Sequence, residues 1–224
     1  MTLSKLAGLI AFALLLAMPA GAFSAPSPNP SPEEVARRLQ AQYDQTRNFI
    51  ADFQQSTTME MSGRKKVGRG RVTLQKPGRM RWDYLEPDRQ VLICDGEKII
   101  MYLEKSHQMI ISSAKEYLAS DVTYSFFTGN GNILRDFEVQ SATDVPEQAP
   151  GLATIKLIPK TGHPHVDHLY LWVDTSDYLL RAMRIIDHLG SVTDIVFSNL
   201  QRNVEIPSDV FTFDPPEGTE IIRQ

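Results

Sequence analysis

Apolar and polar residues alternate through the stretch from Gly68 to Gly96, and this alternation predicts three successive β-strands. In the middle strand, Met80, Trp82 and Tyr84 alternate with charged residues. Successive side chains of a strand point to opposite faces, so this strand has one apolar face and one charged face. Two breaks that contain proline separate the three strands: Lys76-Pro77-Gly78 and Glu86-Pro87-Asp88.

Similar patterns occupy most of the remaining chain and predict about ten strands in all. The connections between them are short, which is typical of antiparallel neighbours and not of βαβ units. A sheet of this size curls or closes. We therefore expect a mainly β fold, with a strongly curved antiparallel sheet and a few helices on its concave side. Further strands are expected from residue 49 and at residues 98–103, 108–111, 133–140, 152–158, 165–173, 178–186, 191–199 and 210–213.

A helix is predicted from Pro32 to about Arg47. Ser31 is a favourable N-cap, and Glu34 follows it by three residues as in a capping box. Val35 and Leu39 begin an apolar stripe at helical spacing, which must pack against another part of the fold.

A second helix is predicted within residues 113–128, where the strand alternation stops. Leu118, Val122 and Phe126 follow helical spacing, and Gly129 ends the segment. Its aromatic residues suit a cover over an apolar surface, whereas the spacing alone favours an ordinary core helix. These aromatic residues are Tyr117, Tyr124, Phe126 and Phe127.

The first 22 residues have the pattern of a secretory signal peptide. Lys5 precedes an apolar run from Leu6 to Met18, and small residues follow up to Ala22. The run is shorter than the roughly 20 residues of a membrane span. Residues 23–32 then form a proline-rich linker, and residues 33–224 are expected to form a single domain.

The formal net charge of −4 argues against a general nucleic-acid-binding protein, which is usually basic. Cys94 is the only cysteine, so it has no partner for a disulfide within the chain. Its apolar neighbours favour a buried, unreactive thiol over a catalytic nucleophile.

Sequence motifs of common enzymes are absent from the chain, so we expect no catalytic residue and no cofactor. His163, His165 and His168 are the best candidates for a metal site. However, His168 would point away from the other two on a regular strand, and Pro164 indicates a turn. This spacing favours an interpretation without a bound metal.

A cluster of basic residues lies at and just before the first strands of the stretch over residues 68–96. It has two interpretations: a solvated outer face, or a docking surface for an acidic partner or for anionic lipid headgroups. The partner-docking candidates are Arg64, Lys65, Lys66 and Arg69, followed by Arg71, Arg79 and Arg81.

Three segments, in this order, resemble the periplasmic outer-membrane lipoprotein carrier (LolA-type) family. The first contains Lys76-Pro77-Gly78-Arg79-Met80-Arg81-Trp82-Asp83-Tyr84, then Pro87, Gln90 and Asp95-Gly96; the second runs from Phe126 to Phe137; the third is Phe211-Thr212-Phe213-Asp214-Pro215-Pro216-Glu217-Gly218. The resemblance covers nearly the whole chain after the predicted signal peptide.

The resemblance implies an unclosed β-barrel with a helical lid and no catalysis. It implies a monomeric periplasmic shuttle that binds the acyl chains of lipidated proteins. The cargo would come from an inner-membrane lipoprotein-release complex and pass towards an outer-membrane acceptor. In this interpretation Met80, Trp82 and Tyr84 line the acyl-chain cavity, and the lid carries Tyr124, Phe126 and Phe127.

Lys76 is a departure from the family pattern. The resemblance implies an arginine at this position that holds the lid closed by hydrogen bonds, and lysine lacks the planar fork of arginine. Lys76 is therefore the candidate lid latch. An alternative function for the same fold is a lipid-binding or regulatory protein that senses and does not carry.

Overall fold

The computed structural model describes residues 30–115, 131–145 and 150–224. The predicted signal peptide, most of the linker and the lid candidates Tyr124, Phe126 and Phe127 lie outside the described residues.

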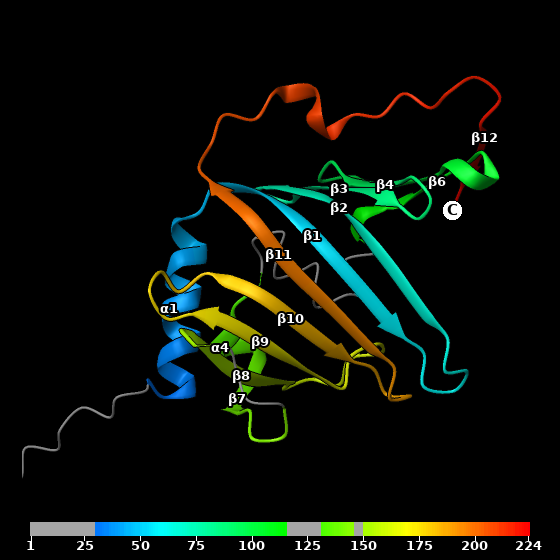
Figure 1. Cartoon of the computed structure of the whole chain (residues 1–224). Helices are drawn as coiled ribbons and strands as arrows, with labels where there is room; N and C mark the ends of the chain where they lie inside the picture. Colours follow the sequence, from blue (N-terminus) through cyan, green and yellow to red (C-terminus); the bar gives the residue numbers. More distant parts are fainter. Residues whose placement is uncertain (1–29, 116–130, 146–149) are drawn as a thin grey trace, which may run out of the picture.

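One curved sheet contains all twelve strands of the described residues, in the order β12-β6-β5-β4-β3-β2-β1-β11-β10-β9-β8-β7 (Figure 1). Neighbouring strands are antiparallel, except that β12 is parallel to β6. The predicted mainly β fold with a strongly curved sheet is therefore confirmed. The strands are β1 (Asn48–Thr58), β2 (Lys65–Gln75), β3 (Arg79–Glu86), β4 (Gln90–Cys94), β5 (Lys98–Leu103), β6 (Gln108–Ser113), β7 (Phe137–Ser141), β8 (Leu152–Pro159), β9 (His168–Asp174), β10 (Leu180–Ile186), β11 (Val192–Arg202) and β12 (Glu220–Arg223).

The register between β2 and β5 confirms the faces predicted for residues 68–96. Val72 pairs with Trp82, Trp82 with Leu92, and Leu92 with Met101. This row belongs to the main apolar cluster of the protein. The neighbouring row carries Arg81 and points to the opposite face.

The N-terminal helix α1 (Pro32–Gln45) packs against the short helix α4 (Ile133–Asp136) and against β7 and β8. The Ser31 hydroxyl accepts a hydrogen bond from the backbone N–H of Glu34, as expected for an N-cap. The Glu34 carboxylate pairs with Arg37 and Arg38, so its side chain adds charge pairs on the helix surface. Three buried side chains of α1 belong to the apolar cluster of the sheet: Val35, Ala36 and Leu39.

The predicted strand over residues 210–213 is wrong. Residues Ser208–Phe211 form a short 3₁₀ helix, and the last strand is β12. The alternation of Phe211 and Phe213 arises because this segment crosses the outer face of the sheet: Phe211 is buried, and the Phe213 ring lies 4.9 Å from that of Tyr102. Arg81 holds the segment by donating to the backbone oxygen of Val210 at 2.8 Å.

The predicted strand over residues 133–140 begins too early. Its first residues form α4, because the Asn132 side chain caps a helical turn by accepting from the backbone N–H of Arg135 at 2.9 Å. Gln40 of α1 accepts a hydrogen bond from the backbone N–H of Ile133 at 2.9 Å. This long-range contact positions α4 beneath α1.

Gly70 offers a test of the close pairing between β2 and β3. A Cβ added at Gly70 would lie 1.8 Å from the backbone oxygen of Asp83, which real structures do not tolerate. We predict that Gly70→Ala lowers the free energy of unfolding by about 2 kcal/mol or more, because the strands must separate. At Gly162 an added Cβ meets nothing within 4 Å, so Gly162→Ala should change stability by no more than about 0.5 kcal/mol. Urea denaturation of both variants measures this, and equal stabilities would contradict the close pairing of β2 with β3.

Candidate apolar binding surface

Met80, Trp82 and Tyr84 lie on one face of β3, as the sequence predicted. Met80 and Trp82 are buried, and Tyr84 is partly buried and packs against the main apolar cluster. Phe53 of β1 connects the two aromatic residues, since its ring lies 4.8 Å from the Trp82 ring and 4.9 Å from the Tyr84 ring. Both contacts are edge-to-face, which is a favourable arrangement of aromatic rings. These residues form a continuous aromatic surface.

The polar atoms on this surface differ in their hydrogen bonding. The Tyr84 hydroxyl donates to the side-chain oxygen of Gln55 at 2.8 Å. The indole N–H of Trp82 is buried and has no hydrogen-bond partner among the described residues. Apart from the Tyr84–Gln55 pair and this indole N–H, the side chains named on this surface are apolar.

A small apolar cavity lies between α1 and strands β10 and β11. Its volume is about 50 Å³. A pocket for a drug-sized ligand is roughly 300–1,000 Å³, so this cavity must widen before it admits a long acyl chain. Its lining is Leu39, Tyr43, Thr46, Phe49, Leu179, Leu180, Phe197, Leu200 and Arg202. Phe197 also contacts Trp82 at a ring distance of 6.4 Å, which joins the cavity to the aromatic surface.

Lys76 contacts the C-terminal end of α1, beside this cavity. Its ammonium donates to the backbone oxygen of Tyr43 and lies 3.6 Å from the centre of the Tyr43 ring. A cation at a helix C-terminus is stabilised by the unpaired carbonyl groups there. Burial lowers the pKa of Lys76, and the nearby Asp44 carboxylate opposes this effect. Within the described residues, the candidate latch thus connects the β2–β3 turn to α1.

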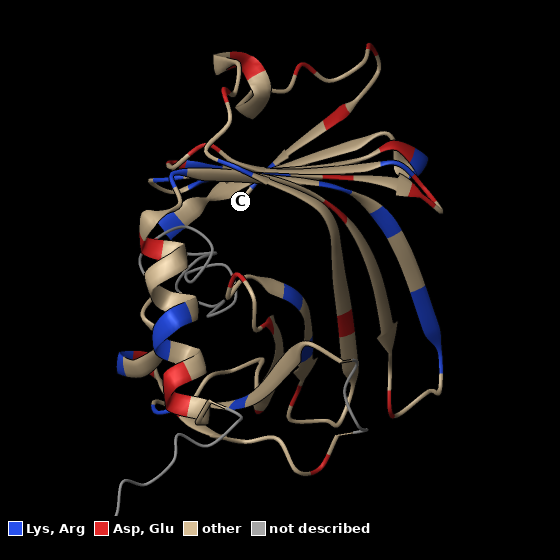
Figure 2. Cartoon of the chain, turned by 60° about the vertical axis from the view of Figure 1, so that its left-hand side comes forward, with Lys and Arg blue, Asp and Glu red and all other residues tan. Residues whose placement is uncertain are grey.

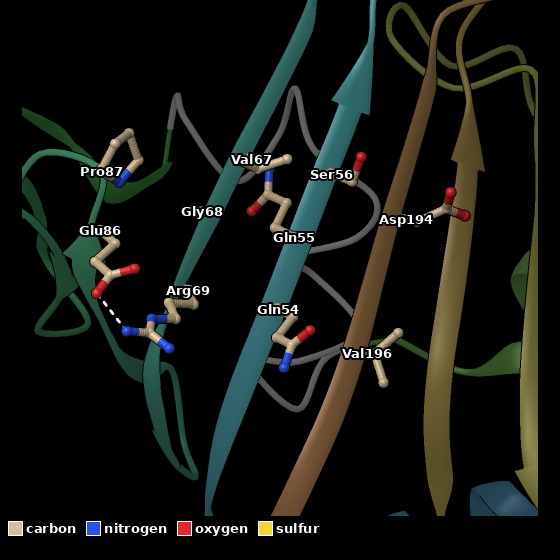
Figure 3. Close-up of a pocket in the computed structure, with 10 residues that line it drawn as sticks. All are labelled: Gln54, Gln55, Ser56, Val67, Gly68, Arg69, Glu86, Pro87, Asp194 and Val196. Carbon is tan, nitrogen blue, oxygen red and sulfur yellow. Dashed lines mark hydrogen bonds and ion pairs between the residues drawn. The ribbon is translucent and has the colours of Figure 1, made fainter.

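A larger groove lies on the outer face and has a different chemistry (Figure 3). Its volume is about 580 Å³. Gln54 alternates with the inward Phe53 and pairs with Arg69 and Val196, which places these side chains on the outer face. An ion pair between Arg69 and Glu86 crosses one end of the groove (Figure 3). The lining mixes charged and amide side chains with the exposed Val67 and Val196.

Six of the seven basic candidates divide into two groups, and Arg79 instead lies near the Phe211 ring. Arg69 pairs with Glu86, Arg71 with Asp52, and Arg81 with Asp83. In the described part of the chain, no ion pair involves Arg64, Lys65 or Lys66, which are exposed at and next to the β1–β2 loop. In Figure 2 the ribbon carries blue segments, which mark basic residues, along β2 towards this loop.

The histidine candidates do not converge on a common point. The His163 ring accepts a hydrogen bond from the backbone N–H of His165 at 3.2 Å. His168 instead pairs with Asp167 and packs against Tyr170. In residues 30–115, 131–145 and 150–224, no group of three or more His, Cys, Asp and Glu side chains is arranged to hold a metal ion.

Cys94 is fully buried, and burial raises the pKa of its thiol. This confirms the predicted buried cysteine. In the described ranges, no helix is long and apolar enough to cross a membrane.

A sequence model of the family described as "Outer membrane lipoprotein carrier protein LolA" matches residues 44–214. The chain belongs to this family. An outer-membrane lipoprotein carrier protein of Dechloromonas aromatica is 28% identical over 179 residues, which cover 80% of this chain and 83% of the relative. A protein of the same name from Pseudomonas fluorescens is 26% identical over 210 residues, covering 94% and 98% of the two chains.

The fold also resembles that of a solved structure, an uncharacterized conserved protein from Thermus thermophilus. The TM-score is 0.54 at 13% sequence identity, and the match covers 86% of this chain and 98% of that protein. This likeness concerns the fold alone.

Several residues of the site were not identified from the sequence. Phe197 belongs to a strand that was predicted, and its alternation with polar neighbours could have indicated an inward position. Met101 lies in a run that is apolar on both faces, so the sequence gives no direction for its side chain. Tyr43 was recognised only as part of the helix stripe, because its contact with Lys76 joins positions 33 residues apart.

The contact between Lys76 and Tyr43 predicts a local effect on α1. Replacing Lys76 by Met removes a hydrogen bond to the helix end, worth about 1 kcal/mol, so amide exchange in the last turn of α1 should become about fivefold faster. Lys76→Arg retains a donor and should exchange like the original protein. Hydrogen-exchange mass spectrometry of a peptide spanning residues 38–48 measures this, with a β8–β9 peptide as the internal control. Unchanged exchange in Lys76→Met would show that the contact does not hold α1.

Proposed function

We propose that this protein is a periplasmic carrier that binds the acyl chains of lipidated proteins and takes them from the inner membrane towards the outer membrane. The observation that carries the proposal is the continuous apolar face on the inside of the curved sheet, lined by Met80, Trp82 and Tyr84. Membership of the lipoprotein carrier family supports it. Export would depend on the signal peptide predicted over residues 1–22.

The physical need for such a carrier follows from the cost of exposing acyl chains to water. Each CH₂ group removed from water contributes about 0.8 kcal/mol, so a chain of about sixteen carbons needs an apolar site worth roughly 12 kcal/mol. A site that takes up and later releases such a chain must change between closed and open states. The small cavity between α1 and β11 fits the closed state.

In this proposal, α1 is one of the elements that move. Lys76 fastens the end of α1 to the β2–β3 turn, next to the cavity. Opening would break the contact between Lys76 and Tyr43 and separate Leu39 and Tyr43 from Phe197. The lid candidates Tyr124, Phe126 and Phe127 would complete the cover.

Delivery of cargo requires contact with membrane-bound partners. The β1–β2 loop and the start of β2 carry the exposed cations Arg64, Lys65 and Lys66. Met61 in the same loop is 85% exposed and adds an apolar side chain to this end of the sheet. We propose that this end of the sheet docks onto an acidic surface of the inner-membrane release complex. Charges in such a position mainly raise the rate of association.

The cavity assignment predicts that an inward charge blocks lipid binding. Met101 faces inward in the row of Trp82 and is only partly buried, so Met101→Glu should leave the protein folded. Losing contact with two CH₂ groups of the ligand costs about 1.6 kcal/mol, which corresponds to an affinity loss of about tenfold or more. The outward Val196→Glu should leave affinity within about twofold. Displacement of a fluorescent fatty acid measures both, and equal affinities would contradict the assignment of faces.

The docking assignment predicts that charge reversal at the β1–β2 loop slows cargo transfer and leaves lipid binding unchanged. The triple reversal Arg64→Glu, Lys65→Glu and Lys66→Glu should slow ATP-dependent release of a lipoprotein from inner-membrane vesicles by about tenfold, because electrostatic attraction becomes repulsion. Free fatty acid should bind to the triple variant as before, since these side chains lie outside the cavity. If release proceeds at the original rate at low salt, this loop is not the docking surface.

A further inference from the structure

Two buried side-chain polar atoms in the described residues lack a hydrogen-bond partner: Trp82 Nε1 and the hydroxyl of Thr154. They lie on different faces of the sheet. Trp82 shares its row with Val72 and Leu92 in the main apolar cluster. Thr154 pairs with Trp172 on the opposite face, next to the inward Ile155. Trp82 therefore holds the unpaired buried donor of the proposed binding surface.

An unpaired donor at this position is unfavourable for the folded protein alone. A buried N–H without an acceptor loses its hydrogen bonds to water and gains nothing in return, and folded proteins keep few such groups. Phenylalanine would fill much of the same space without this cost. The donor is therefore explained most simply by an acceptor that arrives with a ligand.

Among the residues that the structure describes, none accepts a hydrogen bond from the Trp82 indole N–H. Only 3% of its surface is exposed, and its ring packs against Phe53 at 4.8 Å and near Phe197 at 6.4 Å. The Tyr84 hydroxyl, two residues further along the strand on the same face, donates to Gln55 and is not bonded to the indole N–H. A hydrocarbon chain also brings no acceptor. An acyl group does, through the carbonyl oxygen of its ester or amide bond.

We propose that Trp82 Nε1 donates a hydrogen bond to the carbonyl oxygen of a bound acyl ester or amide. The inference rests on the proposed function, since it requires an acyl chain on the concave face. In an environment of low dielectric, such a bond is stronger than in water. The indole thus limits how far the chain enters the cavity and favours acyl groups over bare hydrocarbons.

A comparison of two ligands tests this proposal. Methyl decanoate carries a carbonyl oxygen, and undecane is a hydrocarbon of similar length; each displaces the fluorescent probe 1-N-phenylnaphthylamine from the full-length mature protein. Trp82→Phe removes the N–H and keeps an aromatic ring against Phe53. The dissociation constant for methyl decanoate should rise about tenfold, while that for undecane should change by less than about threefold.

Tyr84→Phe is the matched control. It removes a polar atom from the same strand and the same face, but one that already has a partner within the protein. Any change in affinity should be the same for the ester and for the hydrocarbon. A preference for the ester that is lost equally in both variants would overturn the assignment to Trp82.

The indole N–H resonance of Trp82 gives a readout that does not depend on a variant at Trp82. A Trp172→Phe protein has Trp82 as its only tryptophan, so its indole signal is unambiguous. Methyl decanoate should move this proton resonance downfield, as hydrogen bonding does, and undecane should not. An identical response to both ligands, with an equal loss of affinity for both in Trp82→Phe, would show that Trp82 only packs. If neither ligand displaces the probe from the unmodified protein, the proposed lipid binding itself fails.

Discussion

The structure depends on one constraint: the inward face of a twelve-stranded curved sheet is apolar and must be kept from water. In most domains two layers satisfy such a constraint by packing permanently against each other. Here α1 and α4 cover part of the face near β7 and β8. Met80 and Trp82 on β3 are also buried, so the proposed binding of an acyl chain requires the protein to open.

The outer face is stabilised by different interactions. Ion pairs such as Arg69 with Glu86 and Arg71 with Asp52 connect neighbouring strands, although each exposed pair contributes little by itself. The C-terminal segment crosses the outside of β3–β5, fastened by Arg81, and ends as β12 beside β6 (Figure 1). The strands around Trp82 are thereby held from the outer side.

The parts of the fold that could be predicted from the sequence are those with local causes. The faces of β2 and β3 follow from alternation, the turn at Pro77 from proline, and the start of α1 from the Ser31 cap. Prediction failed where a distant contact decides the local structure. Phe211 and Phe213 alternate like a strand, but they cover an outer surface that the sequence does not reveal.

In the candidate site, too, residues with a local sequence pattern could be predicted and those that depend on distant contacts could not. The two-residue period of a strand is enough to assign Met80, Trp82 and Tyr84 to the apolar face. Phe53 and Phe197 complete this face because strands far apart in the sequence lie side by side in the sheet. Lys76 was a candidate only because the family that the sequence resembles has an arginine at this position. Its contact with Tyr43 depends on how α1 lies against the sheet. No local pattern encodes that arrangement.

The central claim is that acyl chains of lipidated proteins occupy the concave face. Photo-crosslinking in cells tests it most directly, with a benzoylphenylalanine placed at the inward Met101 and, separately, at the outward Val196. The account predicts crosslinks from position 101 to lipoproteins, and their loss when the acylated cysteine of the cargo is replaced. Crosslinks that persist with the unlipidated cargo, or that form equally from position 196, would contradict it.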